Sequence, residues 1–149
     1  MKILFAPLSN FLSHVTRLLC IADELKNRGH QTEFICSSEA SDMIKKAGHK
    51  PNQAPEVDRN VMFQMGASKA YLARFRETSN GKINMNNHPY RLKEMMDADI
   101  SIVKETNPDL IITDGRPVSH LCAWFMDIPC ISVLNISGYI SYSLTVRTE

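Results

Sequence analysis

The start of the chain carries the pattern that most constrains the fold, a strand, a helix and a second strand in immediate succession. Residues 2–8 (KILFAPL) form a short apolar run typical of a buried central strand. In residues 14–28, apolar side chains recur at helical spacing, with Ser13 as the expected N-cap and Gly29 as the expected stop. Residues 31–36 (QTEFIC) are predicted to form the next strand. Such βαβ units are right-handed crossovers and build parallel sheets.

The rest of the chain continues this alternation of strands and helices without an internal repeat, and Trp124 is expected to pack in the core as part of it. Further helices are predicted at residues 38–47, 90–106 and 117–127, and further strands within 50–57 and at 110–113 and 130–134. The alternation predicts an α/β fold, a Rossmann-like, doubly wound parallel sheet with strand order 3-2-1-4-5 in a single domain.

Composition and charge exclude several other classes of protein. The 149 residues are 44% hydrophobic and 22% charged with a formal net charge of +1, as in an ordinary globular domain. No cluster of Lys and Arg predicts a nucleic-acid surface, and no stretch approaches the roughly 20 apolar residues of a membrane span. The amino terminus does not have the pattern of a signal peptide, because Pro7 ends its apolar run.

The cysteines occur without Cys-x-x-Cys spacing and without an accompanying histidine pair, so we expect no metal site. All four lie in apolar stretches, where a free cysteine behaves as a small buried hydrophobe. These are Cys20, Cys36, Cys122 and Cys130. We expect them to be reduced core residues, which favours a cytoplasmic protein.

A histidine and an aspartate are expected to meet at one crevice of this sheet. The crevice of a doubly wound sheet lies where strand order reverses, at the carboxyl ends of the strands, here those at 2–8 and 110–113. His14 follows the first of these strands and Asp114 ends the second. A helix dipole disfavours a protonated imidazole, while a carboxylate favours it and fixes its tautomer, a combination suited to a general base. In the alternative interpretation, which the residue types alone slightly favour, His14 caps a helix and Asp114 closes a strand.

The loop after the first strand lacks the residues that nucleotide sites require at this place. The stretch PLSNFLSHVTR contains no glycine, whereas a dinucleotide-binding turn needs Gly-x-Gly-x-x-Gly so that the backbone can approach the pyrophosphate. A Gly-Lys-Ser/Thr phosphate loop is absent as well. An NAD or nucleotide site at this loop is therefore not expected.

Two blocks of the sequence resemble the amino-terminal part of GT-B fold glycosyltransferases, in the group of UDP-glycosyltransferases, macrolide glycosyltransferases and MurG-like enzymes. Together the two blocks cover about half the chain in the order of the family, with Ser13 where the family has glycine. The matching residues are Ser13-His14-Val15, Ile21-Ala22-Asp23-Glu24-Leu25, Arg28-Gly29-His30, the strand through Phe34, Pro108 to Asp114, and Ile128-Pro129.

The resemblance implies roles for the residues that match. His14 is expected to be the base on an acceptor hydroxyl, and Asp114 to orient it, in a transfer that inverts configuration. The nucleotide-sugar donor is a co-substrate in this family, bound mainly by a second domain, and no resident metal or cofactor is expected. Residues 1–149 correspond to the amino-terminal, acceptor-binding domain, so we expect a donor-binding domain to be supplied in cis or in trans.

Further residues are candidates for contacts to the substrate, because they lie in the loop after the first strand, in the region that shapes the acceptor site in this family, or at the rim of the crevice. These are Asn10, Phe11, Ser13, Phe63, Met65, Tyr71, Arg116 and Asn135. The aromatic and Met residues have an alternative interpretation as ordinary core. Arg116, like Arg17, could bind an anionic ligand or pair with a structural acid. Asn135 could be a turn residue.

The function expected from these observations is that of the acceptor-binding half of an inverting glycosyltransferase, a hexosyltransferase fragment or subunit that is inactive without a donor domain. Its partner would be a small, hydroxyl-bearing acceptor. The alternative is a non-catalytic binding or scaffolding domain of the same fold, and a small nucleotide-binding domain is a weaker third.

Overall fold

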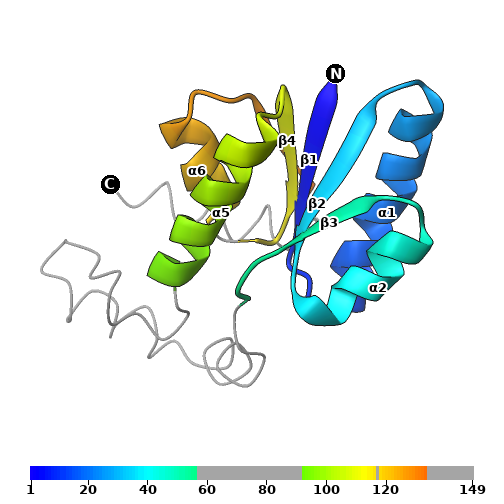
Figure 1. Cartoon of the computed structure of the whole chain (residues 1–149), viewed down its shortest axis with the longest axis horizontal. Helices are drawn as coiled ribbons and strands as arrows, with labels where there is room; N and C mark the ends of the chain where they lie inside the picture. Colours follow the sequence, from blue (N-terminus) through cyan, green and yellow to red (C-terminus); the bar gives the residue numbers. More distant parts are fainter. Residues whose placement is uncertain (57–91, 117, 134–149) are drawn as a thin grey trace, which may run out of the picture.

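The computed structural model describes residues 1–56, 92–116 and 118–133, which form a parallel sheet between two helical layers (Figure 1). The strands lie in the order β3-β2-β1-β4-β5, so the predicted α/β fold and strand order are confirmed. The elements are β1 (Lys2–Pro7), α1 (Leu12–Asn27), β2 (Gln31–Cys36), α2 (Ser38–Lys46), β3 (Lys50–Gln53), α5 (Leu92–Thr106), β4 (Leu110–Asp114), α6 (Ser119–Phe125) and β5 (Cys130–Ser132).

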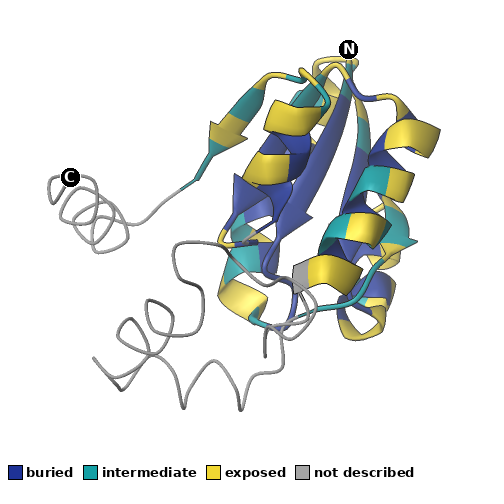
Figure 2. Cartoon of the chain, turned by 90° about the vertical axis from the view of Figure 1, so that its left-hand side faces the viewer, coloured by how far each residue is buried: buried dark blue, intermediate teal, exposed yellow. Residues whose placement is uncertain are grey.

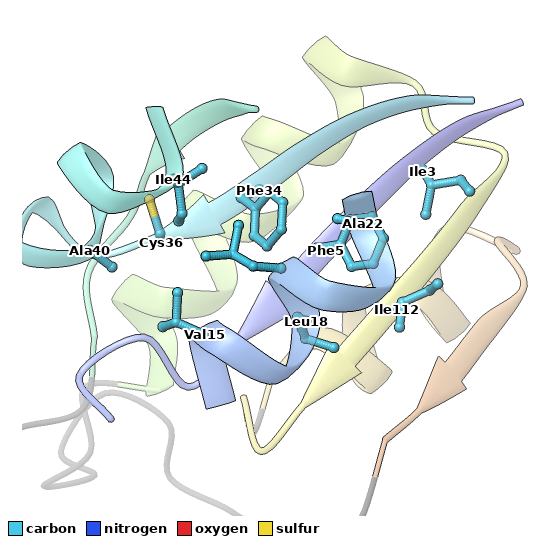
Figure 3. Close-up of a cluster of buried hydrophobic side chains, with 11 residues drawn as sticks. Ile3, Phe5, Val15, Leu18, Ala22, Phe34, Cys36, Ala40, Ile44 and Ile112 are labelled. Atoms are coloured by element: carbon cyan, nitrogen blue, oxygen red, sulfur yellow. The ribbon is translucent and has the colours of Figure 1, made fainter. Parts of the chain in front are cut away.

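The central strand β1 divides its side chains between the two faces of the sheet, as the twofold period of a strand requires. Ile3 and Phe5 belong to the cluster beneath α1 and α2, where the ring of Phe5 stacks on that of Phe34 with centroids 4.9 Å apart (Figure 3). Leu4 and Ala6 belong to the cluster on the opposite face, which packs against α5 and α6. Apolar residues on both faces explain why this strand reads as a continuous apolar run.

The helix α1 begins two residues earlier than the sequence predicts, and Ser13 is not its N-cap. The N-cap is Phe11, whose extended backbone lets its carbonyl accept hydrogen bonds from the amides of His14 (3.1 Å) and Val15 (3.4 Å). The Phe11 side chain packs against the buried cluster that contains Leu8, and the start of the helix has no side-chain cap hydrogen bond. His14 consequently lies within the first helical turn rather than at its entrance.

Trp124 is 81% exposed, so its predicted core position is wrong. The inner face of α6 carries the small buried residues Cys122 and Ala123, and the helical period then directs Trp124 and Phe125 outward. Across the fold, the central strands are buried and the helices are exposed on their outer sides (Figure 2). The helix predicted from the spacing of the large apolar residues of α6 is present, but these residues lie on its outer face and not in the core.

All four cysteines are free thiols, but they are not all core residues. Cys36 and Cys122 are buried, Cys130 is half-buried, and Cys20 is exposed on the outer side of α1, so its predicted burial is wrong. Burial raises the pKa of Cys36 to about 11 and that of Cys122 to about 12. Among the helices that the structure describes, none is long and apolar enough to cross a membrane.

Candidate active site

The carboxyl ends of β1 and β4 lie side by side, as the sequence predicts for the reversal point of the sheet. Pro7 is in register with Asp114, and the amide of Leu8 donates a hydrogen bond of 2.8 Å to the Asp114 carbonyl. After Leu8 the chain turns into α1, which carries His14 over the end of β4. Residues a hundred positions apart in the sequence thereby share one edge of the sheet.

His14 and Asp114 form a hydrogen-bonded pair at this edge. The Nδ1 atom of His14 lies 2.6 Å from Oδ1 of Asp114, and the side chains are 22% and 3% exposed respectively. A carboxylate can accept but cannot donate, so Nδ1 carries a proton, and in the neutral ring Nε2 carries the lone pair. Within the described ranges, both polar contacts of the ring, to Asp114 and Arg17, involve Nδ1, and no hydrogen bond engages Nε2.

Arg17, one helical turn after His14, binds the same carboxylate. Its Nε donates to Oδ2 of Asp114 at 2.6 Å, and its Nη2 donates to Oδ1 at 3.2 Å. Nη2 also approaches Nδ1 of His14 to 3.3 Å. Asp114 is therefore held by two side chains of α1, and of the two roles considered for Arg17 the structure shows the pairing with an acid.

Gly115 brings the backbone against the His14 ring. A Cβ atom at this position would lie 3.1 Å from Cε1 and 3.3 Å from Nδ1 of His14, closer than side chains normally pack. Its φ of +76° belongs to the left-handed region that glycine adopts without strain. The backbone at Asp114–Gly115 is thus in close contact with the imidazole ring of His14.

Arg116 lies in a buried network of ionic hydrogen bonds. It donates from Nη2 (2.7 Å) and Nε (2.9 Å) to the two oxygens of Asp99, and from Nη1 to Glu56 at 3.0 Å. The Arg116 and Asp99 side chains are fully buried, and that of Glu56 is 6% exposed. The structure favours the structural interpretation of Arg116 over the predicted substrate contact, because protein acceptors already occupy its guanidinium.

Glu56 extends this network to the end of β1. Its Oε2 accepts hydrogen bonds from the amide and the hydroxyl of Ser9, both at 2.8 Å, and the Ser9 hydroxyl in turn accepts the Ser37 amide at 2.7 Å. Burial raises the pKa of the Asp99 carboxyl, and the hydrogen bonds from Arg116 oppose that shift. Polar groups that follow β1, β2, β3 and β4 are thereby bonded to one another at the carboxyl ends of these strands.

The other predicted substrate contacts are distributed unevenly. Asn10 is buried, Phe11 is half-buried with its ring edge-on to that of His14 at 6.1 Å, and Ser13 is exposed on the first turn of α1. The remaining candidates lie outside the described residues, and they are Phe63, Met65, Tyr71 and Asn135. No group of three or more metal-ligating side chains occurs in the part of the chain that the structure describes.

Sequence reasoning did not identify Asp99 or Glu56 as part of the edge that carries the site. A signal existed for Asp99, which falls on the buried stripe of α5 four residues after Met95, where an acid requires a cation. Glu56 follows a short strand in an irregular stretch, and no pattern in the neighbouring sequence predicts that its carboxylate is buried.

Comparison with known proteins relates the chain to sugar-transferring enzymes, although no family model matches it. It is 24% identical over 143 residues to an uncharacterized glycosyltransferase of Methanosarcina mazei and 23% identical over 138 residues to one of Methanosarcina acetivorans. Both matches cover 93% of this chain and 34% of the relative. The chain therefore spans about a third of the length of the curated relatives it matches.

Solved structures with the same fold are also glycosyltransferases. The calicheamicin glycosyltransferase CalG4 superposes with a TM-score of 0.61 at 19% identity, covering 91% of this chain and 34% of that one. The spinosyn rhamnosyltransferase SpnG gives a TM-score of 0.63 at 14% identity, covering 89% of this chain and 34% of that one. The resemblance found in the sequence motifs is confirmed: in fold and in sequence, the chain is similar to about a third of a GT-B glycosyltransferase.

Proposed function

We propose that this chain is the acceptor-binding half of an inverting glycosyltransferase, with His14 as the general base. The observation that carries the proposal is the 2.6 Å hydrogen bond from His14 Nδ1 to Asp114, which leaves Nε2 as the ring nitrogen that can accept a proton. Base and orienting carboxylate in this arrangement form the same functional unit that activates hydroxyl nucleophiles on other folds.

The reaction follows from the tautomer. Nε2 of His14 accepts the proton of an acceptor hydroxyl as the hydroxyl oxygen bonds to the anomeric carbon of a nucleotide-sugar. The bond from that carbon to the diphosphate breaks, and its electron pair leaves with the nucleoside diphosphate. Attack from the side opposite the leaving group inverts the configuration. The proton remains on His14, whose imidazolium Asp114 stabilises and orients.

The donor and acceptor classes are proposed by analogy with structural neighbours. The spinosyn rhamnosyltransferase SpnG has been solved with thymidine diphosphate and with spinosyn aglycone, at TM-scores of 0.58 and 0.62 to this chain. Because the present chain covers only about a third of such enzymes, we propose that a donor-binding part acts with it in cis or in trans. The acceptor would be a small hydroxyl-bearing molecule, hydrophobic or sugar-bearing, and the nucleotide-sugar would be the co-substrate.

The test is sugar transfer by the chain joined to a donor-binding part, for which the remainder of the M. mazei relative is the matched choice. His14→Ala is expected to lower transfer by about 10²–10⁴-fold with its thermal unfolding unchanged, the size typical of a lost general base. His30→Ala is the control, since His30 immediately precedes β2 and lies beside the amino terminus, at the amino ends of the strands, whereas His14 follows the carboxyl end of β1. Equal activity of both variants would refute His14 as the base, and absence of transfer by the joined wild-type protein would favour the non-catalytic alternative.

A further inference from the structure

Arg17 is the part of this site that the proposed base chemistry does not require. It lies one helical turn after His14, and its Nε and Nη2 engage both oxygens of Asp114, at 2.6 Å and 3.2 Å. Its side chain is 37% exposed, so it stands at the rim and is no part of the core. A base and its orienting carboxylate would function without a cation so close to the carboxylate.

The geometry makes Arg17 and a protonated His14 compete. Nδ1 of His14 already gives its proton to Asp114, so the guanidinium Nη2 at 3.3 Å faces another N–H instead of an acceptor. A second proton on Nε2 would give the ring a full positive charge beside the guanidinium. Like charges at this separation disfavour the protonated form of the ring.

Asp114 by itself would have the opposite effect. A carboxylate bonded to an imidazole favours the imidazolium, which carries no lone pair and cannot accept a proton from a hydroxyl. The bidentate contact from Arg17 offsets the charge of Asp114 but leaves its hydrogen bond to Nδ1 in place. With Arg17 in place, Asp114 can therefore orient the ring without strongly favouring its protonated form.

We propose that Arg17 is a positioning residue that balances the charge of Asp114, so that Asp114 can orient His14 without holding it in the protonated form. The catalytic meaning of this role rests on the proposed function, whereas the charge balance itself does not. Within the described residues, the other nearby cation, Arg116, is directed to Asp99 and Glu56, so it does not replace Arg17 at the ring.

The test is the titration of the His14 ring in the 149-residue chain, followed by ¹H–¹⁵N NMR of labelled histidines and assigned with His14→Ala. Arg17→Gln and Arg17→Met are both expected to move the midpoint for His14 to higher pH by about one unit, toward the lower end of charge effects because the site is partly exposed. Arg17→Lys keeps a cation and is expected to restore part of the difference.

Arg28→Gln is the matched control, because it removes an arginine whose partner is the exposed Glu24 on the same helix, and it should leave the His14 midpoint unchanged. His14 midpoints within about 0.2 pH units of wild type in both Arg17→Gln and Arg17→Met would overturn the proposal. Loss of the native circular dichroism spectrum in both would also overturn it, since Arg17 would then be a folding requirement.

The readout separates this inference from the proposed function, since it needs no sugar transfer. A shifted His14 midpoint in the Arg17 variants, together with full activity of His14→Ala, would support the charge balance by Arg17 and refute His14 as the general base. In the joined enzyme, Arg17→Gln is further expected to move the acid limb of the pH profile of kcat/KM to higher pH by the same amount as the His14 midpoint. A merely structural role of Arg17 would lower the rate without moving that limb.

Discussion

Replacing Arg116 by methionine removes the guanidinium that Asp99 and Glu56 share. The substitution keeps an unbranched side chain but leaves two carboxylates, fully buried and 6% exposed, without this cation. Asp99 loses hydrogen bonds of 2.7 Å and 2.9 Å, and Glu56 loses one of 3.0 Å. Breaking a buried ion pair by removing one partner costs about 3–5 kcal/mol, and we expect that loss in the free energy of unfolding at neutral pH.

Asp99→Asn provides the contrast. The amide oxygen of asparagine can still accept a hydrogen bond, and Arg116 keeps its contacts to Glu56 and to the Pro55 carbonyl at 2.9 Å. The expected loss is about 1–3 kcal/mol, smaller than for Arg116→Met, because no carboxylate is left without its cation.

The difference between Arg116→Met and wild type should also depend on pH. Burial already raises the pKa of Asp99, and removal of the guanidinium that opposes this shift raises it further. A carboxyl with a raised pKa in the folded state destabilises the fold once it is ionised, so the loss is greatest near pH 7 and shrinks toward about pH 5.

Urea unfolding followed by far-ultraviolet circular dichroism is the assay, since Trp124 is 81% exposed and reports poorly by fluorescence. Arg28→Met, at an exposed ion pair, is the control and should stay within about 0.5 kcal/mol of wild type. A loss below about 1 kcal/mol for Arg116→Met at pH 7, or one that does not diminish with acidity, would refute the reasoning.

Two further predictions concern the backbone at the site and the thiols. Gly115→Ala should destabilise the fold by about 1–2 kcal/mol, because φ is +76°, and should perturb the NMR signals of His14, 3.1 Å from the new Cβ; an unchanged ring spectrum would contradict the close contact. Iodoacetamide at pH 8, followed by mass spectrometry, should label the exposed Cys20 first and leave Cys36 and Cys122 protected, since burial holds their pKa at about 11 and 12; equal labelling would show that these two thiols are accessible.

The fold could be predicted because its determinants are local. The apolar run of β1, the helical spacing in α1 and the glycine at residue 29 each specify an element without reference to the rest of the chain. Short alternating elements then leave few arrangements, since parallel crossovers share one hand. The predicted strand order is the one observed.

The pairing of His14 with Asp114 could also be predicted, because topology alone brings the ends of β1 and β4 together. The orientation of individual side chains could not. Phe11, not Ser13, is the N-cap of α1, and Trp124 lies outside because small residues occupy the inner face of α6. These outcomes depend on packing across the sheet, which sequence spacing does not encode.

The charged residues around the site show the same limit. From the sequence, Arg17 and Arg116 could each bind either a ligand or an acidic side chain. Which of the two they bind depends on the side chains that face them in the fold. The structure pairs Arg17 with Asp114, and Arg116 with Asp99. Neither pairing follows from the separation of these residues in the chain.

The central claim is that Nε2 of His14 accepts the proton of an acceptor hydroxyl. Its most direct test is sugar transfer from a nucleotide-sugar by the joined enzyme, with wild type, His14→Ala and His30→Ala measured side by side at equal thermal stability. Transfer is expected to fall by about 10²–10⁴-fold in His14→Ala and to be unchanged in His30→Ala. Transfer by His14→Ala at the wild-type rate would contradict the claim.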